Sequence, residues 1–278
     1  MTTLIAALCC MGLLGIAFGV GLAVASKRFH VDTDPRIDQV YEALPHIDCG
    51  ACGYGGCQAY AEAVVLHDEA VDLCVPGGEE TAQEVADIMG VELASTKHKS
   101  RAVCLCQGGL GVAAQEAEYS GVDDCRAAQL VQGGPKVCKY GCLGFGTCAK
   151  ACPFDAITMS EDRLPVIDED KCTACGVCVR TCPVHILTIL PSQHRVFMAC
   201  SNPEHKGKTM KQMCSRGCIK CRLCVKVTES GAITWGEEGL PAIDFEQWTD
   251  PDMALEKCPM GCFVDQREGA AEAREAAG

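Results

Sequence analysis

The chain begins with a long apolar stretch that predicts a helix able to cross a membrane. Residues 4–25 contain no charged side chain. As a helix, this stretch would rise about 33 Å at roughly 1.5 Å per residue, enough for a hydrocarbon layer of about 30 Å. Lys27 and Arg28 follow directly, whereas residues 1–3 carry no Lys or Arg. The positive-inside rule therefore predicts an anchor over residues 1–28 in the bacterial cytoplasmic membrane, with the N-terminus outside and the bulk of the chain on the cytoplasmic side.

A cleaved signal peptide is the competing interpretation of this stretch. Ala23-Val24-Ala25 fits the small-x-small pattern of a cleavage site. A signal peptide normally begins with a basic region, however, and this chain has none there. We therefore favour the anchor.

The next segment has the apolar spacing of a helix and leads into a glycine-rich loop. Ile37, Val40 and Leu44 fall on one helical face. The loop has the pattern Cys-x2-Cys-x4-Cys, and glycines let a backbone fold tightly around an inorganic cluster. Zinc also binds four thiolates but usually takes two Cys-x2-Cys units, and only one is present here. We expect a small helical domain over residues 29–95 with one [4Fe–4S] cluster, whose ligands are Cys49, Cys52, Cys57 and Cys74.

Composition supports a protein held together by clusters. Cysteine makes up 24 of 278 residues, whereas aromatic residues make up only 5%. Large apolar cores are therefore not expected, and small domains with poor cores need cross-links or metal centres. The net charge of −13 argues against nucleic-acid binding, because no basic stripe is available to displace counterions from phosphates.

A second cysteine region carries the bacterial ferredoxin pattern. The run Cys-x2-Cys-x2-Cys-x3-Cys-Pro begins at Cys172, and its fourth cysteine typically binds the other cluster of a pair. A similar run lies 30 positions earlier, but Phe145 stands where Cys175 would repeat. We expect a two-cluster domain over residues 136–199, with Cys138 replacing the missing ligand. The two expected ligand sets are Cys152, Cys172, Cys175 and Cys178, and Cys138, Cys142, Cys148 and Cys182.

The ferredoxin pattern returns after a shift of 76 positions. Residues 164–168 and 240–244 match, as do Cys182-Pro183 and Cys258-Pro259. All four ligands of one cluster are lost together, being replaced by Thr228, Trp248, Pro251 and Ala254. The other set remains, so we expect one cluster over residues 200–264, followed by a flexible tail over residues 265–278. Its expected ligands are Cys218, Cys221, Cys224 and Cys258.

Several cysteines remain outside these sets, some of them in a connecting region over residues 96–135. One hypothesis is a fifth cluster; the other is unligated thiols in a reducing compartment. Cys104 and Cys262 are expected to be ordinary thiols. The candidate ligands of the fifth cluster are Cys106, Cys125, Cys200 and Cys214.

These patterns predict an α+β protein with one transmembrane helix, a small helical iron–sulfur domain and two ferredoxin-like units of the βαββαβ type. Thiolates select iron–sulfur clusters or zinc, and paired clusters pass electrons. No dinucleotide-binding glycine motif and no phosphate-binding loop is present. We therefore expect electron transfer and no catalytic residue of the chain's own.

The order of these features resembles the B subunit of the Rnf complex. One membrane helix is followed by the Cys-x2-Cys-x4-Cys domain and by the sequence DCRAAQLVQGGPKVCKYGCLGFGTCAKACPFDAI. The resemblance covers nearly the whole chain. It implies one component of a membrane-bound ferredoxin:NAD oxidoreductase that translocates Na+ or H+. It also implies soluble ferredoxin and the flavin-bearing membrane subunits of the complex as partners.

Three other functions stay open at this point. A polyferredoxin component of another membrane oxidoreductase would share the chemistry. The spacing Cys214-x3-Cys218-x2-Cys221 matches radical enzymes that use S-adenosylmethionine, but fewer than 60 residues follow it, too few for their barrel. A zinc-stapled interaction protein is the third.

Overall fold

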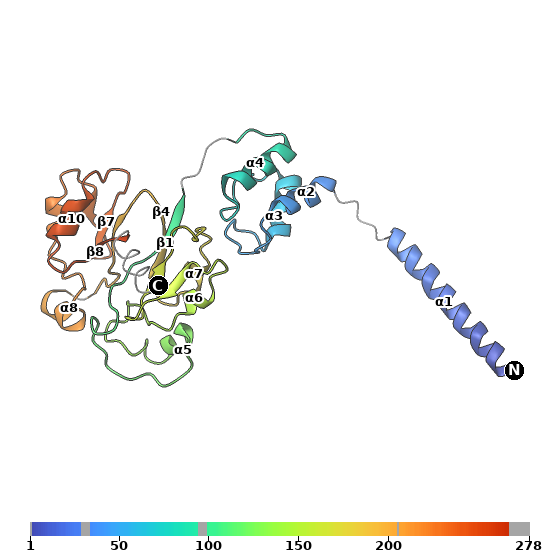
Figure 1. Ribbon diagram of the computed structural model, residues 1–278, viewed down its shortest axis with the longest axis horizontal. Coiled ribbons are helices and arrows are strands. Elements are labelled where there is room, and N and C mark those ends of the chain that lie inside the picture. Colours follow the sequence, from blue (N-terminus) through green and yellow to red (C-terminus); the bar gives the residue numbers. More distant parts are fainter. Residues whose placement is uncertain (1, 29–33, 94–98, 205, 267–278) are drawn as a thin grey trace.

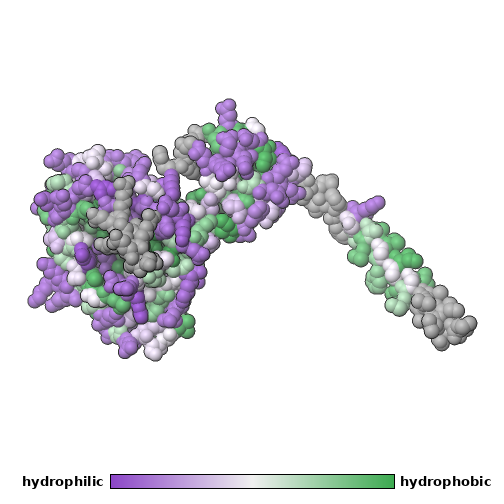
Figure 2. Space-filling view, in the orientation of Figure 1, coloured by the Kyte–Doolittle hydropathy of each residue, from purple (hydrophilic) through white to green (hydrophobic). Residues whose placement is uncertain are grey.

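The computed structural model describes residues 2–28, 34–93, 99–204 and 206–266. Helix α1 (Thr2–Arg28) stands apart from the rest of the described chain (Figure 1). From Met11 onward its apolar side chains are exposed, and they form the band of hydrophobic surface along this helix in Figure 2. The part Met11–Arg28 is long and apolar enough to cross a membrane. Most of the tail that we expected to be flexible lies outside the described residues.

Three short helices form a small N-terminal domain, α2 (Pro35–Ala43), α3 (Cys57–His67) and α4 (Gly78–Met89). Asp34 caps α2, since its carboxylate accepts the Arg36 amide at 2.9 Å. The expected apolar face of α2 is buried and packs against α3 and α4. Burial of this face holds together helices that are too short to be stable alone.

The remainder of the chain combines short helices with short antiparallel strand pairs. Within the described residues every sheet has two strands. The pairs are β1 (Ser100–Cys104) with β4 (Leu187–Pro191), β2 (Ile157–Met159) with β3 (Pro165–Ile167), β5 (Val196–Met198) with β8 (Phe263–Asp265), and β6 (Ile233–Trp235) with β7 (Pro241–Ile243). The helices are α5 (Cys125–Leu130), α6 (Thr147–Lys150), α7 (Val177–Thr181), α8 (Gly207–Met213), α9 (Leu223–Val227) and α10 (Pro251–Lys257). The mixed helix and strand content agrees with the expected α+β class.

These elements make two units with the same order of helices and strands. We call β1 to β4 (100–191) the first unit and β5 to β8 (196–265) the second unit. Cys104 pairs with Leu187 in the first unit, and Met198 pairs with Phe263 at the same place in the second. Each unit therefore begins with a strand that pairs with its own last strand. The sequence-based boundaries had assigned β1 to the connecting region and β5 to the preceding domain.

The cores of both units are small and rich in cysteine. The main core of the first unit combines Ile157, Ile186 and Leu187 with several buried thiols. The main core of the second unit combines Val196, Ile233 and Phe263 with other cysteines. Cysteine thus occupies interior positions that larger apolar side chains fill in most domains of this size. The folded units bring their cysteines together in the interior.

Candidate iron–sulfur sites

Four cavities are each lined by at least four of the cysteines named in the sequence analysis. Their volumes are similar, ≈ 320, ≈ 300, ≈ 350 and ≈ 360 Å³ in the order given below. Among the described residues, no three His, Cys, Asp or Glu side chains are close enough together to hold a single metal ion. A four-iron cluster is bulkier than one ion and keeps its thiolates farther apart, so these cavities fit a [4Fe–4S] cluster better than zinc. The cysteine sets are Cys49, Cys52, Cys57 and Cys74; Cys152, Cys172, Cys175 and Cys178; Cys218, Cys221, Cys224 and Cys258; and Cys106, Cys138, Cys200 and Cys214.

The N-terminal cavity lies where the glycine-rich loop enters α3. The Cys57 amide donates to Asp48 Oδ1 at 2.7 Å. Gly56 has a φ of 148°, and a Cβ there would lie 2.8 Å from the same oxygen, so only glycine fits this turn. Tyr60 holds the segment that leads to Cys74. Its hydroxyl donates to the Ala70 carbonyl at 2.8 Å and accepts the Leu73 amide at 3.2 Å. All four expected ligands line this cavity.

The first ferredoxin cavity combines the expected crossed set. Cys152 comes from the end of α6, and the other three cysteines come from the loop and helix α7 that follow β3. The Ala102 amide of β1 donates to Cys172 Sγ at 3.4 Å. Burial, with smaller contributions from the neighbouring Cys172 and Cys175 thiolates, raises the pKa of Cys178 to about 12. Iron would offset this cost by binding the thiolate form.

For the other cluster of the ferredoxin pair, the structure brings together three of the four expected ligands. Cys142, Cys148 and Cys182 share a buried core, which also contains Cys104. Cys138, the expected fourth ligand, instead lines the cavity with Cys106, Cys200 and Cys214. Buried Lys136 explains the difference, because its ammonium donates to the carbonyls of Gly108 and Cys142, both at 2.6 Å, and so fixes this segment beside the end of β1.

Cys125 also lies elsewhere than expected. Cys125 packs with Ala128 and Leu143 in a small core. Phe145, which stands where the ferredoxin pattern lacks a cysteine, packs against this core. Burial, with smaller contributions from the Cys125 and Cys182 thiolates, raises the pKa of Cys148 to about 11. The structure therefore brings Cys125 toward the ferredoxin pair and not toward Cys200 and Cys214. The unexplained Phe145 was the signal in the sequence that could have indicated this placement.

Helix α5 holds Cys125 in this position. Asp124 caps the helix, accepting the amides of Arg126 at 2.8 Å and Ala127 at 3.1 Å. The same carboxylate accepts the Thr147 hydroxyl at 3.0 Å, and Thr147 Oγ1 accepts the Cys125 amide at 2.7 Å. Because Thr147 begins α6 and immediately precedes Cys148, these bonds tie Cys125 to the ferredoxin pair.

The C-terminal cavity contains all four expected cysteines of the second unit. Cys262, which we expected to be an ordinary thiol, lies beside them, and its amide donates to Cys258 Sγ at 3.3 Å. Hydrogen bonding by the Cys262 thiol lowers the pKa of Cys258 to about 5 and that of Cys218 to about 7. Such bonds to sulfur stabilise the thiolate form that binds iron.

Two family profiles match regions that contain these cavities. Residues 44–76 match a profile described as an Fe–S cluster domain, and residues 136–189 match a 4Fe-4S dicluster domain. The first match covers the N-terminal ligands and the second covers the ferredoxin pair. Together, the fold and the cysteine cavities define a multi-cluster iron–sulfur protein.

Three relatives align over most of this chain. The B subunit of the Na+-translocating ferredoxin:NAD+ oxidoreductase complex of Acetobacterium woodii is 43% identical over 91% of this chain and 75% of its own length. The B subunit of the proton-translocating ferredoxin:NAD+ oxidoreductase complex of Clostridium ljungdahlii is 44% identical over 95% and 93%. The B subunit of the ion-translocating oxidoreductase complex of Methanosarcina acetivorans is 41% identical over 88% and 92%. The chain belongs to this family, the B subunits of ion-translocating ferredoxin:NAD+ oxidoreductase (Rnf) complexes.

Proposed function

We propose that this chain passes electrons between soluble ferredoxin and the flavin- and NAD-linked subunits of an ion-translocating membrane complex. Each [4Fe–4S] cluster, when bound, takes up and releases one electron at a time. Helix α1 anchors the chain, and the Lys27 and Arg28 pair at its end favours the cytoplasmic side for the folded domains. Ferredoxin and the other subunits of the complex are thus the partners.

One observation carries this proposal, the contact between two cysteine cavities. Arg180, on α7, donates from one guanidinium nitrogen to the Cys175 carbonyl and from another to the Cys49 carbonyl. It therefore joins the ligand loop of the N-terminal domain to that of the ferredoxin pair. Sites joined in this way suit the transfer of electrons toward the membrane-side domain.

For the second cluster of the pair we infer the ligands Cys125, Cys142, Cys148 and Cys182. The small core that contains Cys125 packs against Phe145, whose equivalent in the second unit is the cavity residue Cys221. Cys104 is the competing choice, since it lies in the same core. Its thiol, however, donates to the Cys106 carbonyl at 3.6 Å, and its equivalent in the second unit is Met198, which is no iron ligand there.

The experiment is a ligand substitution within the complete complex, purified without oxygen. Cys175→Ala should remove about four iron atoms per chain and slow electron transfer from reduced ferredoxin by roughly tenfold or more, because one cluster of the pair is lost. Iron and sulfide analysis with electron paramagnetic resonance (EPR) measures the first effect, and stopped-flow spectroscopy the second. Cys104→Ala is the control, since it removes a buried thiol that we assign to no cluster. An unchanged iron content in Cys175→Ala would refute the assignment.

A further inference from the structure

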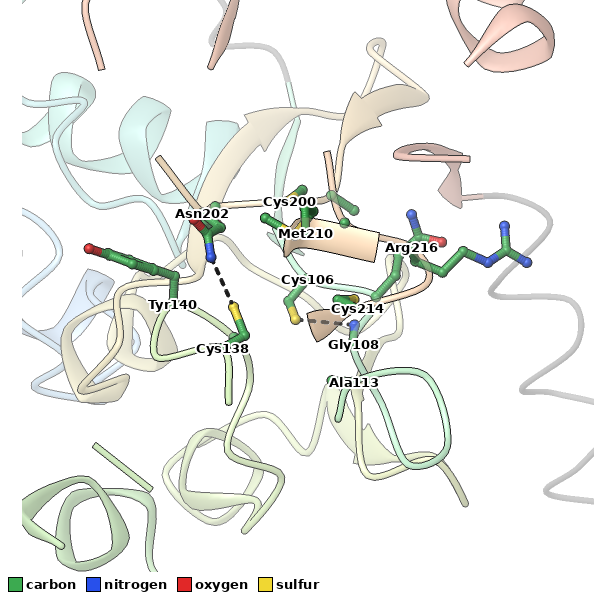
Figure 3. A pocket seen from close by; sticks show the side chains of 15 residues that line it. Cys106, Gly108, Ala113, Cys138, Tyr140, Cys200, Asn202, Met210, Cys214 and Arg216 are labelled. Atoms are coloured by element: carbon green, nitrogen blue, oxygen red, sulfur yellow. Dashed lines mark hydrogen bonds between the residues drawn. The ribbon is translucent and has the colours of Figure 1, made fainter. Parts of the chain in front are cut away.

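The cavity between the two units has ligands from both of them. Cys106 and Cys138 come from the first unit, and Cys200 and Cys214 from the second; Figure 3 shows the four side chains around one space. Asn202 Nδ2 donates to Cys138 Sγ at 3.5 Å, and the Gly108 amide donates to Cys106 Sγ at 3.3 Å. The sulfurs thus already accept hydrogen bonds of the kind that stabilise cluster thiolates.

The four cysteines form two structurally equivalent pairs. Cys106 follows the last residue of β1 by two positions, as Cys200 follows that of β5. The Cys142 amide donates to Cys106 Sγ at 3.3 Å, and the Cys218 amide donates to Cys200 Sγ at the same distance. Cys138 and Cys214 are likewise equivalent, since each precedes the first ferredoxin-type cysteine of its unit by four residues. Each unit therefore presents the same half-site, and the two halves face each other.

Backbone contacts between the two units lie beside this cavity. The Ala114 amide donates to the Met213 carbonyl at 2.8 Å, and Ala113 forms an isolated bridge with Cys214. Met210, fully buried, packs with Ala113 and Cys214 on one wall. The half-sites are therefore held against each other by the backbone.

A buried cation lies beside the cavity. Lys136 is only 3% exposed, and its ammonium bonds to the Gly108 and Cys142 carbonyls. Among the described residues it forms no ion pair with a carboxylate. Burying a charge is costly unless an opposite charge is near, and a cluster with four thiolates is anionic. Lys136 is thus placed to compensate a negative group in this cavity.

Other roles for the four thiols fit less well. None of the described cysteines forms a disulfide. Zinc would draw the four sulfurs closer together than they lie, since no three of them are near enough for one ion.

We propose that Cys106, Cys138, Cys200 and Cys214 bind a [4Fe–4S] cluster at the interface of the two units. This inference rests on the proposed function and extends it. The amides of Cys142 and Cys218, each a ligand of a neighbouring site, bond directly to the interface thiolates. The interface site therefore lies between the ferredoxin pair and the C-terminal site, and it gives the second unit a connection to the rest of the protein.

The test compares two single and two double variants of the full chain in its complex, purified without oxygen. Cys214→Ala should lose about four iron and four sulfide per chain relative to the wild type. Cys138→Ala/Cys214→Ala should lose no more than the single variant, because both cysteines bind one cluster. Cys125→Ala/Cys214→Ala should lose about twice as much, because these cysteines bind different clusters. Cys104→Ala, which removes a buried thiol next to the cavity, should keep the wild-type iron content.

A second measurement separates this proposal from the proposed function. After mixing with reduced ferredoxin, freeze-quenched EPR should show normal reduction of the ferredoxin pair in Cys214→Ala and reduction of the C-terminal cluster slowed at least tenfold. Wild-type iron content in Cys214→Ala, or zinc in the wild-type cavity, would overturn the interface cluster while electron transfer through the pair still stood. Absence of iron and sulfide from the wild type would overturn both.

Discussion

At the scale of single residues, Phe145 accounts for the placement of two cysteines. A ferredoxin run needs four thiolates, and Phe145 removes one from the first unit. Cys125, at the start of α5, lies in a small core with Ala128 and Leu143, and Phe145 packs against this core. Cys138 is then free to line the interface cavity. In the proposed assignment, this single aromatic residue separates the ligand pattern of the first unit from that of the second, where Cys221 has the ordinary position.

The proposed role of Cys125 can be tested by replacing it and introducing a cysteine at position 145. Cys125→Ala should lose about four iron atoms per chain, because the second cluster of the pair then has three thiolates. Adding Phe145→Cys should restore the lost iron, since this position holds a ligand in the usual run. Iron analysis and EPR measure both effects. Phe145→Ala in the same background is the matched control and should restore nothing. If Cys125→Ala alone keeps its iron, Cys125 is not a ligand.

The sequence predicted those ligands whose partners are near in the chain or fixed by a repeated motif. Cys172 and Cys175 belong to a dense run, and Cys152 follows from the crossed arrangement of such runs. The placement of Cys138 depends on Lys136, whose burial and two carbonyl contacts arise only from tertiary packing. Spacing alone contains no information on such contacts, so the sequence-based grouping placed Cys138 with Cys142, whereas in the structure Cys138 lines the cavity of Cys106.

At the scale of elements, the strands that begin each unit were not predicted. Strand β5 has three residues, too few for an alternating pattern to stand out. The ferredoxin runs repeat at 76 positions, whereas Cys104 and Met198 are structurally equivalent at 94. The longer connection in the first unit contains α5, which supplies Cys125. The longer connection that obscured the repeat at β1 is therefore also the segment that supplies the proposed replacement ligand.

Helix α5 should depend on its capping carboxylate. Asp124→Ala removes the acceptor of two helix amides and of the Thr147 hydroxyl, so α5 should hold Cys125 less firmly. We expect the second cluster of the pair to be lost to an iron chelator roughly five-fold faster, as followed by absorbance and EPR. Asp123→Ala, at the exposed neighbouring carboxylate, should match the wild type. Equal rates in both variants would show that the cap does not position the ligand.

The same cap gives a pH dependence with a defined sign. The hydrogen bond from the Ala127 amide lowers the pKa of Asp124, with further lowering by the Thr147 hydroxyl. A carboxylate with a lowered pKa stabilises the fold above its unfolded value of about 3.9, and the contribution is lost as the pH falls through the lower folded value. At neutral pH the cap is therefore fully present, and small changes around pH 7 should leave the chelation rate of the wild type unchanged at this site.

At the scale of the whole molecule, the cysteine cavities follow the order of the chain. In Figure 1 the first unit lies between the N-terminal domain and the second unit. Arg180 joins the first two along this direction, and the interface cavity joins the last two. Helix α1 lies at the end where the N-terminal domain is. The proposed electron route therefore runs along these contacts, between the two units and the N-terminal domain.

Arg180 should matter for transfer between domains and not for the clusters themselves. Arg180→Met removes the donors to the Cys49 and Cys175 carbonyls while the thiolates of both sites remain. We expect a wild-type iron content and a roughly two- to fivefold slower reduction of the N-terminal cluster, the range given by a surface contact of up to about 1 kcal/mol. Freeze-quenched EPR after mixing with reduced ferredoxin resolves this step. Arg126→Met, which removes an exposed guanidinium from α5, is the matched control. If Arg180→Met reduces the N-terminal cluster at the wild-type rate, electrons reach this domain without the Arg180 contact, and the route must pass through another surface of the first unit.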